Sequence, residues 1–188
     1  MFEWYLIISV ALSKEAMRFQ YTYEQGFDTS CGIAVTATLL NTYWGLNVSE
    51  KELIEKFITP KIEKKDYSVT MADIAGIVKF YNLASKAYAM NLTQLRDAIK
   101  KGFAPIIIHY EKPVKHFVLL LGFDNDWIII ADPARGLEAI SEATFMERYS
   151  GNVLLVASNS KKVQLEKLGN AINTASTRAD LLELVATW

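Results

Sequence analysis

The chain has 188 residues and a mass of 21.2 kDa, with 51% hydrophobic residues and 20 basic against 21 acidic residues. This is the size of one globular domain, and the balanced charge gives no basic surface for nucleic acid or an anionic membrane. The sequence has one cysteine, Cys31, which excludes an intramolecular disulfide and a multi-cysteine metal site. We expect no nucleic-acid partner, and we identify no cofactor or metal site.

The N-terminal segment, residues 1–22, contains an apolar stretch at residues 4–12. No run in the sequence approaches the roughly 20 apolar residues of a membrane-spanning helix. The stretch also lacks a basic flank, since Glu3 precedes it, and it lacks a clear cleavage site. It is either a degraded or uncleaved export signal, which favours the periplasm over the cytoplasm, or an N-terminal strand or helix that lies on the domain.

Helical signals dominate the first half of the sequence. Residues 31–44 form an almost wholly apolar segment between Ser30 and Gly45, which predicts a central helix. Capping residues predict the starts of three further helices, at Ser49, Thr70 and Asn91.

Strand signals replace the helical pattern after residue 102. Four short runs are rich in isoleucine, valine, leucine and aromatic residues, namely residues 104–110, 116–123, 127–131 and 153–157. Helices followed by hairpin-linked strands predict an α+β fold, in which the helices pack on an antiparallel sheet.

We expect three parts along the chain: the N-terminal segment 1–22, one domain at residues 23–158, and a C-terminal helical tail at residues 159–188. The tail is more polar than the domain, and its apolar residues recur at helical spacing. It is either a docking element for a partner or a terminal helix packed on its own domain.

Cys31 is the first candidate for chemistry because it begins the predicted central helix. The free amide groups and the positive end of the helix dipole lower the pKa of a thiol at this position, which favours a nucleophile. Gly32 has no side chain, so a substrate carbonyl can approach the sulfur. A lone cysteine is more often a buried structural residue, and the Cys31–Gly32 pair alone favours that alternative.

A thiolate nucleophile needs an imidazole nearby, and the chain has two histidines, His109 and His116. His116 begins one predicted strand and Asp132 ends the next. A hairpin centred on Asp124 places His116 directly opposite Asp132, where the carboxylate can orient the imidazole. A two-residue loop would instead shift the strand register by one residue and put the two side chains on opposite faces of the sheet. His109 lies within a strand pattern and fits a core or edge position.

Gln25 lies six residues before Cys31, in a polar loop. Acyl transfer requires a hydrogen-bond donor to the oxyanion of the tetrahedral intermediate. The side-chain amide of Gln25 can fold back beside the backbone N–H of Cys31 and supply this donor.

These residues resemble the bacteriocin-processing, double-glycine cysteine peptidases of papain-like fold. The resemblance rests on Gln25 before Cys31-Gly32, on His116-Phe117-Val118 and on Asp132-Pro133-Ala134, and it covers residues 23–157. It implies that Cys31 is the nucleophile, His116 the general base and acid, Asp132 the orienting residue and Gln25 the oxyanion donor. It also implies a short helix near residues 141–149.

That family cleaves after a Gly-Gly pair at the end of a leader peptide, usually just before the cargo is exported. The best-known members are fused to a membrane-spanning, ATP-driven transporter. We find no such part in this sequence, so it is more similar to the stand-alone peptidases of secretion systems for surface fibres or functional amyloid. The resemblance therefore implies a cysteine endopeptidase whose partners are a leader-bearing substrate and a secretion-system component bound through the tail.

Two alternatives remain open. One is a catalytically silent peptidase-like domain that binds leader or cargo peptides, and the other is a different papain-like thiol amidase or acyltransferase.

Overall fold

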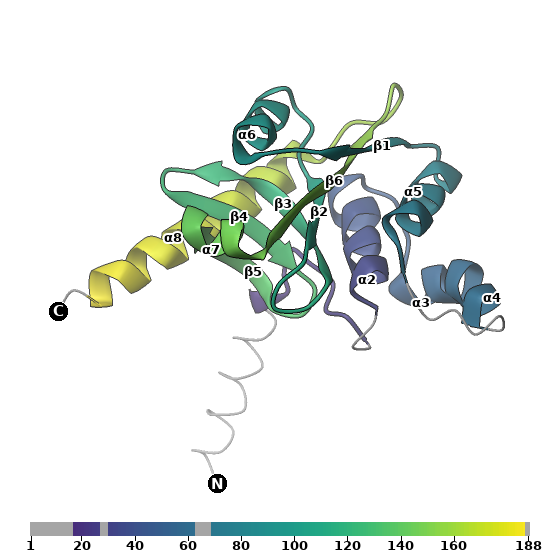
Figure 1. The fold of residues 1–188 in the computed structure, drawn as a ribbon, viewed down its shortest axis with the longest axis horizontal. Coiled ribbons are helices and arrows are strands. Elements are labelled where there is room, and N and C mark those ends of the chain that lie inside the picture. The colour runs from purple at the N-terminus through teal and green to yellow at the C-terminus, as the bar shows by residue number, and fades with distance from the viewer. Residues whose placement is uncertain (1–16, 27–29, 63–68, 187–188) are drawn as a thin grey trace, which may run out of the picture.

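The computed structural model describes residues 17–26, 30–62 and 69–186. Its centre is an antiparallel sheet with the strand order β1-β6-β2-β3-β4-β5 (Figure 1). The strands are β1 (Ala84–Ala89), β2 (Ile106–Tyr110), β3 (His116–Asp124), β4 (Trp127–Asp132), β5 (Gly136–Ser141) and β6 (Tyr149–Ala157). The apolar stretch at residues 4–12 lies outside the described residues, so both interpretations of it stay predictions.

The helices cover both faces of this sheet. They are α2 (Cys31–Ala37) with a π-helical continuation (Thr38–Tyr43), α3 (Glu50–Leu53) with a π-helical continuation (Ile54–Ile58), α4 (Thr59–Ile62), α5 (Met71–Phe80), α6 (Leu92–Lys100), α7 (Glu142–Arg148) and α8 (Leu165–Ala186). The fold is therefore α+β, as predicted, with the helix of Cys31 packed on an antiparallel sheet.

Strand β3 is buried on both sides, which explains why its sequence is a continuous apolar run. Phe117, Leu119 and Leu121 belong to the core that β3 shares with α2, α5 and α8. Val118 and Leu120 belong to a second core on the opposite face, formed with α6 and α7. The site described below lies at one end of this sheet, where β3 begins and β4 ends.

The predicted central helix is confirmed, with a change of geometry in its second half. Its α-helical part is almost completely buried, and Gly45 ends the helix with a φ of 65°. The π-helical part begins at Thr38, whose hydroxyl donates to Ala34 O at 2.8 Å and accepts from Tyr23 N at 2.9 Å. These bonds also tie the N-terminal part of the described chain to α2.

The three predicted capping starts are confirmed. The side chains of Ser49, Thr70 and Asn91 each accept a hydrogen bond from the backbone N–H three residues later. Strands β1 and β5 were not predicted from the sequence. The short helix implied near residues 141–149 is α7.

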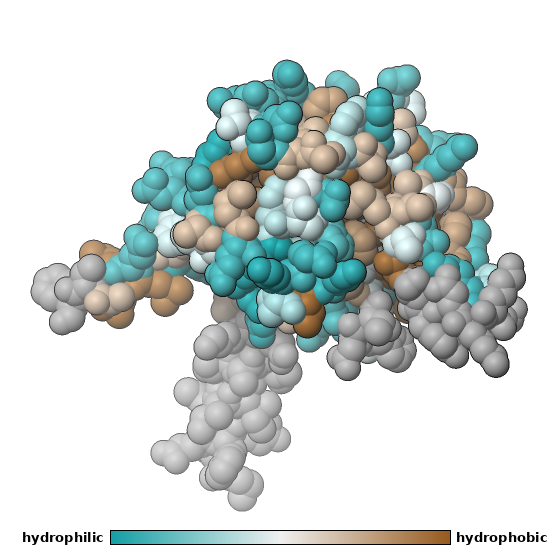
Figure 2. Space-filling model, in the orientation of Figure 1, coloured by the Kyte–Doolittle hydropathy of each residue, from teal (hydrophilic) through white to brown (hydrophobic). Residues whose placement is uncertain are grey.

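Helix α8 packs on the rest of the domain from Leu168 to Asp180. Its buried residues include Leu168, Ala171 and Ala175, and Trp127 of β4 donates from Nε1 to Asp180 Oδ1 at 2.9 Å. Apolar side chains are exposed at its far end, seen in brown in Figure 2, namely Leu181, Leu182, Leu184 and Val185. Docking of a partner on this tail stays a prediction. Within the described ranges, no helix is long and apolar enough to cross a membrane.

Candidate active site

The candidate site forms where the first turn of α2 meets the start of β3 and the end of β4. Cys31 is the first residue of α2 and is half-buried. His116 is the first residue of β3, and Asp132 is the last residue of β4. The fold thus brings together three residues that are far apart in the sequence.

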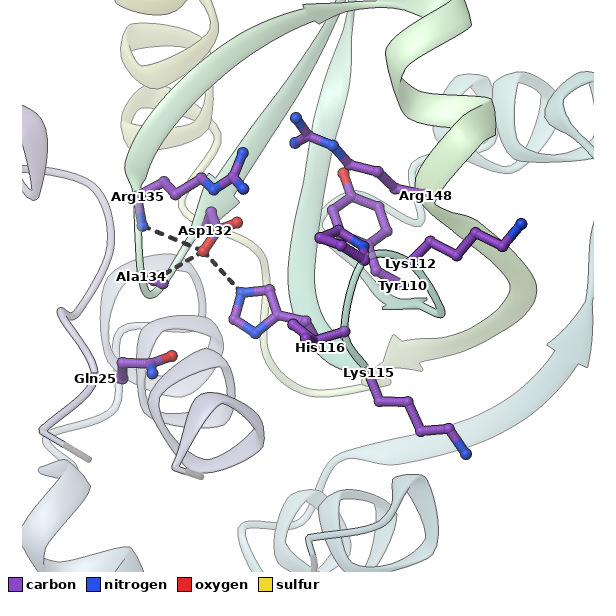
Figure 3. Close-up of a pocket in the computed structure, with 11 residues that line it drawn as sticks. Gln25, Tyr110, Lys112, Lys115, His116, Asp132, Ala134, Arg135 and Arg148 are labelled. Atoms are coloured by element: carbon purple, nitrogen blue, oxygen red, sulfur yellow. Dashed lines mark hydrogen bonds and ion pairs between the residues drawn. The ribbon is translucent and has the colours of Figure 1, made fainter. Parts of the chain in front are cut away.

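His116 and Asp132 point toward each other (Figure 3). Nε2 of His116 lies 2.8 Å from Oδ1 of Asp132, and the two side chains are 15% and 3% exposed. The same carboxylate oxygen accepts from the backbone N–H of Ala134 at 2.8 Å and from that of Arg135 at 3.3 Å. The carboxylate is therefore fixed by the β4–β5 turn, and it orients the imidazole so that Nδ1 remains available to Cys31.

The predicted register of the β3–β4 hairpin was wrong, although the predicted contact between the side chains of His116 and Asp132 is present. The hairpin has a two-residue loop, because Asp124 pairs with Trp127. A bulge between Leu120 and Gly122 then shifts the register by one more residue. This second shift returns the side chains of His116 and Asp132 to the same face of the sheet. Asp132 consequently lies diagonal to His116, not directly opposite, and the two side chains still reach each other.

The surroundings of Cys31 favour its thiolate form. Burial alone raises the pKa of the thiol, but hydrogen bonds from the His116 side chain and from the backbone amides of Phe117 and Gly32, together with the imidazolium charge, hold that pKa below its usual value. The Phe117 contact was not predicted from the sequence. Its position directly after His116 was the available signal.

The surroundings of His116 favour its protonated form. Burial lowers the pKa of the imidazole, whereas the hydrogen bonds and negative charges of Asp132 and Cys31 raise it, and the pKa reaches about 9. Burial likewise raises the pKa of Asp132, but the hydrogen bonds from His116 and Ala134 hold it below its usual value. These shifts together favour a thiolate–imidazolium pair supported by an ionised carboxylate.

Gln25 lies beside this pair and faces the space next to His116 (Figure 3). Its backbone N–H donates to Pro133 O at 2.9 Å, which holds the loop before α2 against the β4–β5 turn. Within the described part of the chain, its buried Oε1 atom has no hydrogen-bond partner. The structure thus places the Gln25 side chain near His116 and Asp132, and its role as oxyanion donor stays a prediction.

His109 lies away from these residues. Its Nδ1 atom is 3.0 Å from the Ser150 hydroxyl, and its ring contacts the edge of Phe117 with a centroid separation of 5.1 Å. His109 is therefore a half-buried, hydrogen-bonded residue of β2, which is an interior strand of the sheet, and it has the structural position predicted for it but not at a sheet edge.

A cavity of about 190 Å³ adjoins the site on the side of His116 and Asp132. Tyr110, Arg135 and Arg148 contribute to its wall from β2, the β4–β5 turn and the end of α7. Sequence analysis missed these three residues because they come from separate elements and share no local pattern.

Gly32 has a packing role that sequence analysis did not identify. A Cβ atom at this position would lie 2.7 Å from Val69 Cγ1 and 3.2 Å from Phe117 Cδ2. The glycine therefore allows α2 to approach β3 closely, and this approach sets the position of Cys31 relative to His116.

We expect Gly32→Ala to destabilise the fold by about 2 kcal/mol, because overpacking of a tight contact typically costs this much. The alkylation rate of Cys31 should fall as well, since α2 must move away from β3. Gly76→Ala is the matched control, because Gly76 lies within α5 and an added Cβ meets no atom within 4 Å among the described residues beyond the neighbouring backbone of its own helix. This control should gain roughly 0.5–1 kcal/mol. Urea unfolding measures both, and equal stabilities of the two variants would contradict the packing role.

Comparison with known proteins agrees with this geometry. The family model described as the Peptidase C39 family matches residues 19–161, which include Gln25, Cys31, His116 and Asp132. The chain belongs to the Peptidase C39 family.

Two curated relatives show the range of proteins in which a Peptidase C39 region occurs. The chain is 26% identical over 142 residues to the probable functional amyloid protease FapD of Pseudomonas fluorescens, a match that covers 74% of this chain and 61% of that protein. It is 30% identical over 146 residues to the colicin V secretion/processing ATP-binding protein CvaB of Escherichia coli, which covers 78% of this chain and 19% of that protein. The chain therefore spans less than two thirds of each relative.

Solved Peptidase C39 domains share the fold. A double glycine motif protease from an AMS/PCAT transporter, in complex with the leader peptide, superposes with a TM-score of 0.63 at 24% identity and covers 73% of this chain and 91% of that one. The peptidase domain of Streptococcus ComA gives the same TM-score and identity and covers 74% of this chain and 99% of that one. At this identity the likeness establishes the papain-like peptidase fold.

Proposed function

We propose that this protein is a cysteine endopeptidase that removes the leader peptide from an exported peptide or protein by cleaving after a Gly-Gly pair. The observation that carries the proposal is the hydrogen-bonded arrangement of Cys31, His116 and Asp132 at the start of α2. In the proposed reaction these residues act as the nucleophile, the proton donor and the orienting carboxylate, which are the groups that papain-type acyl transfer needs.

In the first half-reaction, the Cys31 thiolate attacks the carbonyl carbon of the last leader residue. The oxyanion that forms is held by the Cys31 backbone N–H and the Gln25 side-chain amide. The His116 imidazolium gives its proton to the leaving amine, the carbon–nitrogen bond breaks, and the cargo leaves with a free amino group. The leader remains on Cys31 as a thioester.

In the second half-reaction, neutral His116 takes a proton from water, and the hydroxide attacks the thioester carbon. The tetrahedral intermediate collapses, the carbon–sulfur bond breaks, and the leader leaves with a carboxyl group. Cys31 returns to the thiolate and His116 to the imidazolium. Asp132 stays ionised throughout, because its part is to orient the imidazole and stabilise its charge.

A shallow apolar hollow on the other side of Phe117 supports a peptide substrate. Met71, Tyr88, His109 and Phe117 are among the residues that line it, and it follows the edge strand β1. An extended or helical leader can lie there with its C-terminal end at Cys31. The solved relative in complex with its leader peptide and the FapD relative named as a functional amyloid protease support an exported substrate of this kind.

A peptide assay tests the proposal. The full chain is incubated with a peptide whose leader ends in Gly-Gly, and mass spectrometry locates the cleaved bond. We expect one cut directly after the second glycine, and we expect Gly→Ala at either position to reduce kcat/KM by on the order of 10²-fold, because a methyl group displaces the carbonyl from Cys31. Equal cleavage of the alanine peptides would contradict the Gly-Gly specificity, and no cleavage of any leader peptide would contradict the peptidase assignment.

A further inference from the structure

The cavity beside His116 and Asp132 has a cationic wall. Arg135 and Arg148 face it from opposite sides, and Lys112 and Lys115 lie on its rim and extend outward (Figure 3). Among the described residues that line the cavity, Asp132 is the one acidic residue, and its carboxylate is hydrogen-bonded to His116.

The carboxylates that partner these cations stand outside the lining of the cavity. Glu138 lies 4.0 Å from Arg135 and 3.9 Å from Arg148, and Glu111 lies 3.8 Å from Lys115 on the exposed surface. Glu138 is therefore at ion-pair distance from the two arginines without lining the cavity, and its own buried Oε2 atom has no hydrogen-bond partner among the described residues. The space itself is surrounded mainly by positive charge, which favours an anionic group inside it.

Tyr110 gives independent evidence for a ligand in this space. Its side chain is 3% exposed and lines the cavity, and its hydroxyl has no hydrogen-bond partner among the described residues. Burial raises the pKa of this phenol, so the hydroxyl stays protonated and is a donor. A buried donor without an acceptor is costly, and a carboxylate in the cavity would satisfy it.

The position of the cavity identifies the part of the substrate that enters it. His116 gives its proton to the leaving amine, so the residues after the cleaved bond depart on the imidazole side of Cys31. His116 and Asp132 belong to the wall of this cavity, whereas the apolar hollow along β1 is lined by Phe117 and His109. The two spaces thus have separate linings, one beside the imidazole of His116 and the other along Phe117 and β1.

We propose that this cavity binds the product side of the substrate and selects an acidic side chain among the first three residues after the cleaved bond. This inference rests on the proposed peptidase function. The carboxylate of the bound side chain accepts a hydrogen bond from Tyr110 and pairs with Arg135 and Arg148.

A series of peptides tests the selectivity. Each carries the same leader ending in Gly-Gly, with Glu, Gln or Lys at one of the three following positions, and kcat/KM is measured for each. At one position or more we expect Glu to exceed Lys by about 10-fold or more, with Gln between them, because a charge-assisted hydrogen bond contributes this much.

Two variants connect the preference to the cavity. Tyr110→Phe removes the unpartnered hydroxyl alone, and Arg148→Gln removes one charge. In both variants the ratio of kcat/KM for the Glu peptide to kcat/KM for the Lys peptide should therefore fall close to one. Tyr149→Phe and Arg96→Gln are the matched controls, because Tyr149 donates to Met90 O and Arg96 pairs with Glu142 outside the cavity. Both controls should keep the wild-type ratio.

The outcomes separate this inference from the proposed function. Efficient cleavage with equal rates for Glu, Gln and Lys would overturn the inference alone, as would a preference that survives in both Tyr110→Phe and Arg148→Gln. If no peptide is cleaved, fluorescence anisotropy of labelled product peptides still tests the cavity. Tighter binding of the Glu peptide that is lost in Tyr110→Phe supports the inference, and equal binding of the Glu and Lys peptides overturns it.

Discussion

The Cys31→Ala variant is expected to have no measurable leader cleavage, with kcat/KM reduced by at least roughly 10⁴-fold, because the bond-forming atom is missing. Since Cys31 is half-buried and alanine keeps the helix start, the free energy of unfolding should stay within about 1 kcal/mol of the wild-type value. Chromatographic detection of the cargo, with enzyme in excess over peptide, measures the residual rate.

Cys31→Ser is the matched control for shape. The hydroxyl has nearly the size of the thiol, but it does not ionise near neutral pH, so this variant should be as inactive as Cys31→Ala. A residual rate within 10-fold of wild type in either variant would contradict the assignment of the nucleophile. Circular dichroism and urea unfolding show whether both variants keep the fold.

The second large effect is expected for Asp132→Asn. The amide keeps an oxygen for the backbone N–H of Ala134, but it removes the negative charge that raises the pKa of His116. We expect kcat/KM at pH 7 to fall by on the order of 10²- to 10⁴-fold, because the imidazole loses both its orientation and the stabilisation of its charge.

The pH profile of this variant has a defined direction. The active form is a thiolate with an imidazolium, so activity requires a pH above the Cys31 pKa and below the His116 pKa. In the wild type the activity should fall on the alkaline side with an apparent pKa of about 9, and in Asp132→Asn this apparent pKa should be lower. Asp126→Asn, in the loop of the β3–β4 hairpin, should leave the profile unchanged. An unchanged alkaline limb in Asp132→Asn would contradict the role of the carboxylate.

The positions of Cys31, His116 and Asp132 were predictable because each of these residues begins or ends an element with a strong local signal. Cys31 follows Ser30 at the start of an apolar helix, and His116 and Asp132 delimit two apolar strands. The diagonal relation of His116 to Asp132 was not predictable, because it depends on a bulge inside β3. Gly122 within that strand was the available signal, since a strand glycine often marks a bulge.

Strand β1 and the cationic cavity depend on tertiary contacts. Residues 84–89 carry small and polar side chains with little strand propensity, and their conformation is set by pairing with β6. Tyr110, Arg135 and Arg148 meet because the last residue of β2, the β4–β5 turn and the last residue of α7 lie at the same end of the sheet. No local pattern in the sequence predicts that these three residues lie close together.

The alkylation rate of Cys31 by iodoacetamide, measured from pH 4 to pH 10 in the wild type and in His116→Ala, tests the thiolate–imidazolium pair most directly. The chain has one cysteine, so the total label reports Cys31 without further assignment. In the wild type we expect the rate to rise at a pH clearly below the ordinary thiol pKa of about 8.5. In His116→Ala the inflection should move to the ordinary value or above, because burial remains and the imidazolium is gone. A wild-type thiol that titrates at or above about 8.5, or an acidic inflection that persists without His116, would contradict the account.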